Sequence, residues 1–286
     1  MKRSSTISRR RFLQTSGLGL SAVAVAGLPE KLVAAERQVD PYHGLKVGMT
    51  SYTLHKFNLD QALAMTKEAG VRYISLKDVH LPLKSTREQR QEAHKKVEAA
   101  GLVLMGGGVI YMKNAEEEIA AAFEYAKDAG MPTIICSPDP EALDTVEKMA
   151  KKYEIRIAIH NHGPTDKKYP SPLDVLRLVK DRDERMGICM DVGHTVRIGE
   201  DPVAVINQCA SRLYDFHMKD VTSAKPEGKG IEVGKGVIDI PGVLKALLKL
   251  KFSYHIALEY EANADNPMPG VLGSYAYIRR VLATLS

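Results

Sequence analysis

Short apolar runs alternate with longer amphipathic stretches from residue 45 to the end of the chain, and this alternation constrains the fold more than any other feature. Runs of this length and composition are typical of buried strands, and strands that alternate with helices form a parallel sheet. Eight strands are predicted, over Lys46–Tyr52, Tyr73–Asp78, Val103–Val109, Thr133–Cys136, Arg156–Asn161, Gly187–Asp191, Leu213–Lys219 and Tyr254–Tyr260.

The stretches between these strands have the pattern of amphipathic helices. Over Asn58–Gly70, the residues Leu59, Ala62 and Leu63 form an apolar stripe, and the closing glycine is typical of a helix end. With a final helix over Val271–Leu285, the pattern predicts a single (β/α)8 TIM barrel of the α/β class and favours it over an open doubly wound sheet. The other helices are expected over Thr86–Gly101, Ala115–Gly130, Pro140–Tyr153, Pro172–Lys180, Pro202–Cys209 and Ile240–Leu250.

Residues 1–35 are predicted to be a cleavable twin-arginine export signal that precedes the barrel domain of residues 36–286. The run Ser8-Arg9-Arg10-Arg11-Phe12-Leu13 is followed by an apolar stretch over 18–28 and by Val33-Ala34-Ala35, which fits cleavage before Glu36. We therefore expect a periplasmic or otherwise exported protein. Neither the signal nor any later run approaches the roughly 20 apolar residues of a membrane helix, so no stable membrane insertion is expected after cleavage.

The charge of the chain argues against a nucleic-acid partner. The formal net charge is +5, and the six basic residues and one acidic residue of positions 1–35 account for all of it. A nucleic-acid binder needs a basic excess or stripe that neutralises phosphates, and the remaining domain has neither. The expected partner is a small molecule, and a nuclease built on the same barrel is disfavoured.

Two other features exclude common alternatives. Gly106-Gly107-Gly108 lies within a predicted strand, so it is not a dinucleotide-binding loop, and we expect a close backbone approach there at the barrel rim. The three cysteines, Cys136, Cys189 and Cys209, are odd in number and widely spaced, which makes a disulfide framework unexpected even in an exported protein.

Each of the last four predicted strands has a side chain that could bind a metal ion at or near its carboxyl end. These residues are His160, Asp191, His217 and Glu259. The carboxyl ends of barrel strands form one rim, where the active sites of such barrels lie. Each residue alone could be structural, as a hydrogen-bonded histidine or an ion-paired carboxylate, but four together indicate a shared site. A set of nitrogen and oxygen ligands suits one divalent ion such as Mn, Mg, Co or Zn. His162 lies on the same face as His160 and remains an alternative ligand.

The segments Met190-Asp191-Val192-Gly193-His194, Phe216-His217-Met218-Lys219-Asp220 and Leu258-Glu259-Tyr260-Glu261, in this order, resemble those of the xylose isomerase-like sugar isomerase and epimerase barrels. The resemblance covers the whole barrel domain and implies one divalent metal, most often Mn, with Asp191, His217 and Glu259 as three of its ligands. It also implies a possible homodimer.

The fourth ligand position departs from the commonest family pattern. The family often has Glu-Asn-His at the fifth strand, where this chain has His160-Asn161-His162. The change keeps a ligand but removes a carboxylate that also transfers a proton in the epimerases. Variants of this kind resemble relatives of inosose dehydratases and of enzymes that act on keto-sugars.

Further polar residues are candidates for substrate binding and proton transfer. His194 resembles the family's ligand for a sugar hydroxyl, and Lys219 and Glu261 share its rim. Lys219 could polarise a substrate oxygen, or it could be solvated or paired with Asp220. The candidate bases are Glu259, His162 and His194, in that order. Lys77 and His80 lie at the end of the second predicted strand and point to the same rim, but they are interpreted as an exposed loop pair.

Together these features predict a divalent-metal-dependent sugar isomerase or epimerase that acts through an enediolate on a non-phosphorylated sugar or keto-sugar. The same site could serve a dehydratase or lyase that eliminates from a keto-sugar or inosose, because proton removal beside a carbonyl is common to both. A non-catalytic periplasmic sugar-binding protein is a third alternative.

Overall fold

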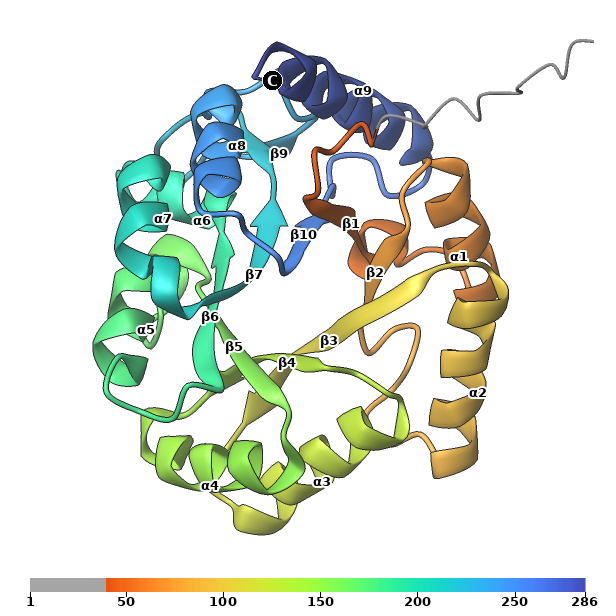
Figure 1. The fold of residues 1–286 in the computed structure, drawn as a ribbon, viewed down its shortest axis with the longest axis vertical. Coiled ribbons are helices and arrows are strands. Elements are labelled where there is room, and N and C mark those ends of the chain that lie inside the picture. Colours follow the sequence, from red (N-terminus) through yellow and green to blue (C-terminus); the bar gives the residue numbers. More distant parts are fainter. Residues whose placement is uncertain (1–39, 286) are drawn as a thin grey trace, which may run out of the picture. The chain divides into compact units, whose positions relative to one another are not determined.

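The computed structural model describes residues 40–285, and in it eight parallel strands close into a barrel surrounded by helices (Figure 1). Consecutive strands of the barrel pair with one another, and the last pairs with the first, which confirms the predicted (β/α)8 barrel. The strands are β1 (Lys46–Thr50), β2 (Tyr73–Leu76), β3 (Val103–Met112), β4 (Thr133–Pro138), β5 (Arg156–His160), β6 (Met186–Asp191), β7 (Leu213–Met218) and β10 (His255–Leu258).

The surrounding helices begin at sequence signals that satisfy their first backbone N–H groups. Asn58, Thr86 and Ser171 each cap a helix and form a reciprocal capping box with the residue three positions later. The helices are α1 (Leu59–Glu68), α2 (Arg87–Ala99), α3 (Glu116–Asp128), α4 (Leu143–Tyr153), α5 (Pro172–Val179), α6 (Val192–Arg197), α7 (Pro202–Cys209), α8 (Ile240–Lys249) and α9 (Met268–Thr284).

Two elements at the carboxyl-terminal end of the barrel were not predicted. The short helix α6 directly follows β6, and its first turn is capped by Asp191, which accepts a hydrogen bond from the backbone N–H of His194. A two-stranded antiparallel sheet, β8 (Asp220–Val221) with β9 (Gly230–Ile231), lies in the connection after β7. These elements are too short to give a periodic pattern.

The glycine run confirms close backbone packing but at a different place from the one predicted. A Cβ atom on Gly106 would lie 2.6 Å from the carbonyl oxygen of Thr133, and one on Gly108 would lie 1.9 Å from that of Ile135. Strand β3 continues to Met112, so the run lies inside the strand and not at the rim. Glycine is needed here because β3 and β4 approach too closely for a side chain.

The remaining predictions about the chain concern cysteines and the membrane. Cys136, Cys189 and Cys209 are buried and unpaired, as expected. Over residues 40–285, no helix combines the length and apolarity that crossing a membrane requires. The predicted export signal of residues 1–35 lies outside the residues that the structure describes.

Candidate active site

Four candidate ligands converge at the carboxyl-terminal rim of the barrel. Their ligand atoms all lie within 4.8 Å of one another. His160, Asp191 and His217 lie at or near the ends of β5, β6 and β7, and Glu259 directly follows β10. The side chains are buried, with exposed fractions between 0% for Asp191 and 6% for Glu259. This cluster is the set predicted from the strand ends, and His162 is not part of it.

The distances within the cluster fit a shared divalent ion. His217 Nδ1 lies 3.1 Å from His160 Nε2 and 3.1 Å from Glu259 Oε2, and Asp191 Oδ2 lies 3.7 Å from His160 Nε2. Adjacent ligand atoms around an ion with bonds of about 2.1 Å stand about 3.0–3.4 Å apart. Asp191 Oδ2 is also buried without a hydrogen-bond partner. These four residues could therefore hold a divalent ion.

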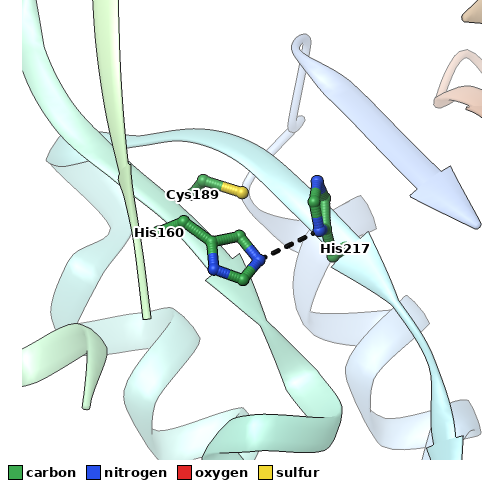
Figure 2. Close-up of side chains that lie close together, drawn as sticks. All are labelled: His160, Cys189 and His217. Atoms are coloured by element: carbon green, nitrogen blue, oxygen red, sulfur yellow. Dashed lines mark hydrogen bonds between the residues drawn. The ribbon is translucent and has the colours of Figure 1, made fainter. Parts of the chain in front are cut away.

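Cys189 lies beside two of these ligands but is a weaker candidate. Figure 2 shows its side chain next to His160 and His217, which face each other. The thiol donates to Asp215 Oδ1 at 3.4 Å, and burial raises its pKa well above the usual range. Because only the thiolate is a strong metal ligand, the carboxylates of Asp191 and Glu259 complete the set better.

The buried carboxylate of Asp215 lies next to His217 Nε2, the ring nitrogen that does not contact the cluster. Asp215 Oδ1 lies 3.5 Å from His217 Nε2, and Asp215 Oδ2 lies 3.7 Å from His255 Nδ1. All three side chains are 1% exposed. A carboxylate behind a ligating histidine commonly selects which ring nitrogen carries the proton. Asp215 and His217 are two residues apart in β7, so their side chains lie on the same strand face.

Two lysines neutralise the carboxylates of the cluster. Lys219 Nζ lies 3.3 Å from Asp191 Oδ2, 3.0 Å from Glu259 Oε2 and 2.7 Å from Glu261 Oε2. Lys77 Nζ lies 3.6 Å from Glu259 Oε1. Burial alone would raise the pKa of Glu259, but Lys219, His217 and Lys77 outweigh it and hold this pKa well below its usual range. Glu259 is therefore ionised, as a carboxylate ligand must be.

Two interpretations from the sequence are wrong. Lys219 is neither solvated nor paired with Asp220, since the Asp220 carboxylate accepts backbone N–H groups from Val221, Gly234, Gly236 and Ile238 and so organises the loop after β7. Lys77 and His80 are not an exposed loop pair. Lys77 reaches Glu259, and His80 is 7% exposed, with Nδ1 2.9 Å from Ser51 Oγ and Nε2 3.1 Å from the carbonyl oxygen of Phe57.

His162 lies outside the ligand cluster but next to it. Its ring centroid is 4.4 Å from that of His160. Its Nδ1 lies 3.2 Å from Asp166 Oδ2, and its Nε2 lies 3.4 Å from the hydroxyl of Tyr111. Burial lowers the pKa of His162, which favours the neutral ring. The contact between Nδ1 and the Asp166 carboxylate is electrostatic, because Nδ1 has no hydrogen-bond partner.

His194 occupies the other side of Asp191. Its Nε2 lies 4.0 Å from Asp191 Oδ2, and its Nδ1 lies 3.4 Å from the guanidinium of Arg197, which donates to it. Burial lowers the pKa of His194. With Nδ1 accepting from Arg197, the neutral ring carries its proton on Nε2. The structure thus brings His194, Lys219 and Glu261 to the rim, as predicted.

A sizeable cavity among the described residues lies away from the cluster. It has a volume of about 640 Å³ and is lined by residues of α1, α2 and the loop before α2, among them Leu59, Leu81, Gln89 and Lys96. No metal-ligand set lines it. The convergence of buried ionisable groups, and not cavity size, therefore identifies the candidate active site.

The fold and the cluster define a TIM barrel with a potential metal centre at its catalytic face. The chain belongs to the family of xylose isomerase-like TIM barrels, whose sequence profile matches residues 63–281. This confirms the family predicted from the strand-end segments.

Curated relatives are similar over part of their length. The rhizopine catabolism protein MocC of Rhizobium meliloti is 29% identical over 141 residues, which cover 44% of this chain and 42% of the relative. An inosose dehydratase of Clostridium beijerinckii is 24% identical over 156 residues, or 49% of this chain and 52% of the relative. The chain thus spans about half the length of the curated relatives that it matches.

Solved structures share the fold over most of the described residues. The structure of an L-ribulose 3-epimerase has a TM-score of 0.70 at 15% identity and covers 84% of this chain and 95% of its own. The 3-keto-D-glucoside 4-epimerase YcjR of E. coli has a TM-score of 0.68 at 15% identity and covers 82% of this chain and 99% of its own. At these identities the likeness extends to the fold alone.

Proposed function

We propose that this protein is a divalent-metal-dependent isomerase or epimerase that removes a proton beside the carbonyl of a non-phosphorylated sugar or keto-sugar. The observation that carries the proposal is the convergence of His160, Asp191, His217 and Glu259 within 4.8 Å at the rim of the barrel. The proposed ion is manganese, and when bound it would act as a Lewis acid that stabilises negative charge developing on the substrate oxygen.

The proton-transfer group is proposed to be His162, ahead of Glu259. Contacts with Lys219 and His217 keep Glu259 ionised and make it a weak base. His162 is a candidate base because burial lowers its pKa and favours the neutral ring, and its centroid lies 4.4 Å from that of His160 in the cluster. His194 would bind a substrate hydroxyl through Nε2, and Lys219 would stabilise an anionic oxygen of the substrate.

Elimination from a keto-sugar or inosose is a second candidate reaction on the same site. It is favoured by His160, which replaces the carboxylate that a two-base epimerisation uses, and by the similarity to inosose dehydratases. The first step is again removal of the proton beside the carbonyl. The two reactions differ in their second step, which is either return of the proton or loss of an oxygen from the neighbouring carbon.

The test is proton NMR in deuterium oxide of the manganese- or magnesium-loaded protein with ketoses, inososes and 3-keto-glycosides. We expect deuterium at the carbon beside the carbonyl of at least one of them, and the product then separates epimerase from lyase. His162→Gln should slow the exchange by about 10²–10⁴. Sugar binding without exchange at any carbon would overturn the proposal in favour of a sugar-binding protein.

Export and assembly are proposed on the sequence alone. We propose that the twin-arginine signal directs the protein to the periplasm and that the mature chain begins at Glu36 and forms a homodimer. Cell fractionation with N-terminal sequencing tests the first point, and sedimentation equilibrium tests the second. A mature chain that begins at Met1 in the cytoplasm would refute the export proposal.

A further inference from the structure

Tyr111 is an exposed aromatic residue at the catalytic face of the barrel. It lies one residue before the end of β3, opposite Ser137 of β4, and is 67% exposed. Among the large apolar side chains of residues 40–285, it is the most exposed and the only aromatic one in the exposed class. Most aromatic rings of a soluble domain are at least partly buried, because their burial stabilises the fold.

The ring of Tyr111 continues a surface that begins at the ligand cluster. Its centroid lies 6.0 Å from that of His162, and the two rings are nearly parallel, with an interplanar angle of 20°. His162 in turn lies 4.4 Å from the ligand His160. A molecule that binds at the cluster therefore has an aromatic surface beside it, extending from His162 to Tyr111.

Polar groups border this aromatic surface. The backbone N–H of Asp139 donates to the carbonyl oxygen of Met112, the residue after Tyr111, and the Asp139 carboxylate accepts from Lys168 Nζ at 2.9 Å. Asp166 lies behind His162. Sugars have apolar C–H faces and polar hydroxyl edges, so an aromatic ring with charged groups at its margin suits a sugar ring.

We propose that Tyr111 and His162 form a subsite for a second ring, so that the substrate is a glycoside and not a free monosaccharide. The first sugar ring would lie at the ligand cluster, and the group linked to it would stack on Tyr111. This inference rests on the proposed function, since it assumes that the cluster binds a sugar. It assigns a specificity role to the ring of Tyr111, whose hydroxyl lies 3.4 Å from His162 Nε2.

The experiment compares two ligands that differ only in the second group. Methyl and phenyl 3-keto-β-D-glucopyranoside are titrated into the manganese-loaded protein, and their dissociation constants are measured. We expect the phenyl glycoside to bind about threefold to tenfold more tightly. Tyr111→Ala should abolish this preference. Tyr111→Phe should keep the preference, and Leu178→Ala, on the outer face of the barrel in α5, serves as a matched control.

The outcomes separate the subsite from the proposed function. An equal preference for the phenyl glycoside in wild type and Tyr111→Ala overturns the subsite, while deuterium exchange on the methyl glycoside still supports the proposed function. Equal binding of the two glycosides by the wild type overturns the subsite as well. Failure to bind either glycoside, with metal bound, counts against both.

Discussion

The ligand cluster and the outer rim of the site differ in burial and in how the chain positions them. The candidate ligands His160, Asp191 and His217 have side chains that are at most 3% exposed and lie on barrel strands. In the outer rim, the side chain of His162 is 24% exposed and that of Glu261 is 40% exposed, and both follow strand ends. Strands fix the buried ligands, whereas the outer residues depend on loops, so the two layers should respond differently to substitution.

The largest effect is expected for Asp191→Asn. The amide oxygen can still cap α6 by accepting from the backbone N–H of His194, but the carboxylate ligand is lost. We expect manganese affinity to fall by more than about 100-fold. Substituting a residue that only contacts a ligand typically costs about 10–100-fold, and losing a ligand should cost more. The manganese affinity is measured by competition with a chelating dye.

Asp191→Ala is the matched control, because it removes the helix cap as well. It should lose metal binding equally and also about 1 kcal/mol of stability. If Asp191→Asn retained wild-type metal affinity, the proposed ligand set would be wrong.

A smaller effect is expected for Asp215→Asn, which changes the residue behind His217 and keeps its size. Asp215 lies 3.5 Å from His217 Nε2 and favours a proton there, so that Nδ1 faces the cluster. We expect manganese affinity to fall by about 10–100-fold. Nitrogen-15 NMR of the metal-free protein should show a shift of the His217 proton away from Nε2. Unchanged tautomer and unchanged affinity would show that Asp215 has no positioning role.

The sequence predicted the buried layer because strand geometry determines it. The apolar runs ended at His160, Asp191 and His217, and the closed barrel brings those ends to one rim. The choice between His160 and His162 was left open, since two residues on the same strand face differ only in depth. In the structure, His160 is the last residue of β5 and belongs to the cluster of candidate ligands, whereas His162 lies beyond the strand and outside that cluster.

The outer layer was predicted less well because it depends on loop conformation. Asp166 and Tyr111 gave no signal, since their contacts with His162 arise only when the loop after β5 folds beside the end of β3. Lys77 was misinterpreted for a similar reason, because its partner, Glu259, is distant in sequence. Asp220 was misassigned because a single carboxylate that accepts several backbone N–H groups has no sequence pattern.

Acidification should destabilise the metal-free protein by about tenfold in its unfolding equilibrium. Burial lowers the pKa of four described histidines, so the unfolded chain binds protons more readily than the folded chain below the ordinary value of about 6.5. Their stabilising contribution is present above that pH and is lost as the pH falls. The four residues are His80, His160, His162 and His194.

The pKa of His217 is shifted in the opposite direction, but this one shift does not cancel the effect of the other four. Burial lowers its pKa, but Glu259 and Asp215 outweigh burial and raise it, so this single ring favours folding at lower pH. Urea denaturation at pH 7 and pH 5.5 should show the loss of stability, and His80→Gln should reduce that loss. A stability that rises on acidification would contradict the assignment.

The smallest effect on metal binding is expected for Glu261→Gln in the outer rim. Its carboxylate lies 2.7 Å from Lys219 Nζ, but it is 40% exposed, and ion pairs in contact with water are worth about 0–1 kcal/mol. Lys219 also keeps its contacts with Asp191 and Glu259, which hold it in place. Manganese affinity should therefore change by less than about fivefold. A loss as large as that of Asp215→Asn would mean that the outer rim supports the ligands directly, and the division into two layers would fail.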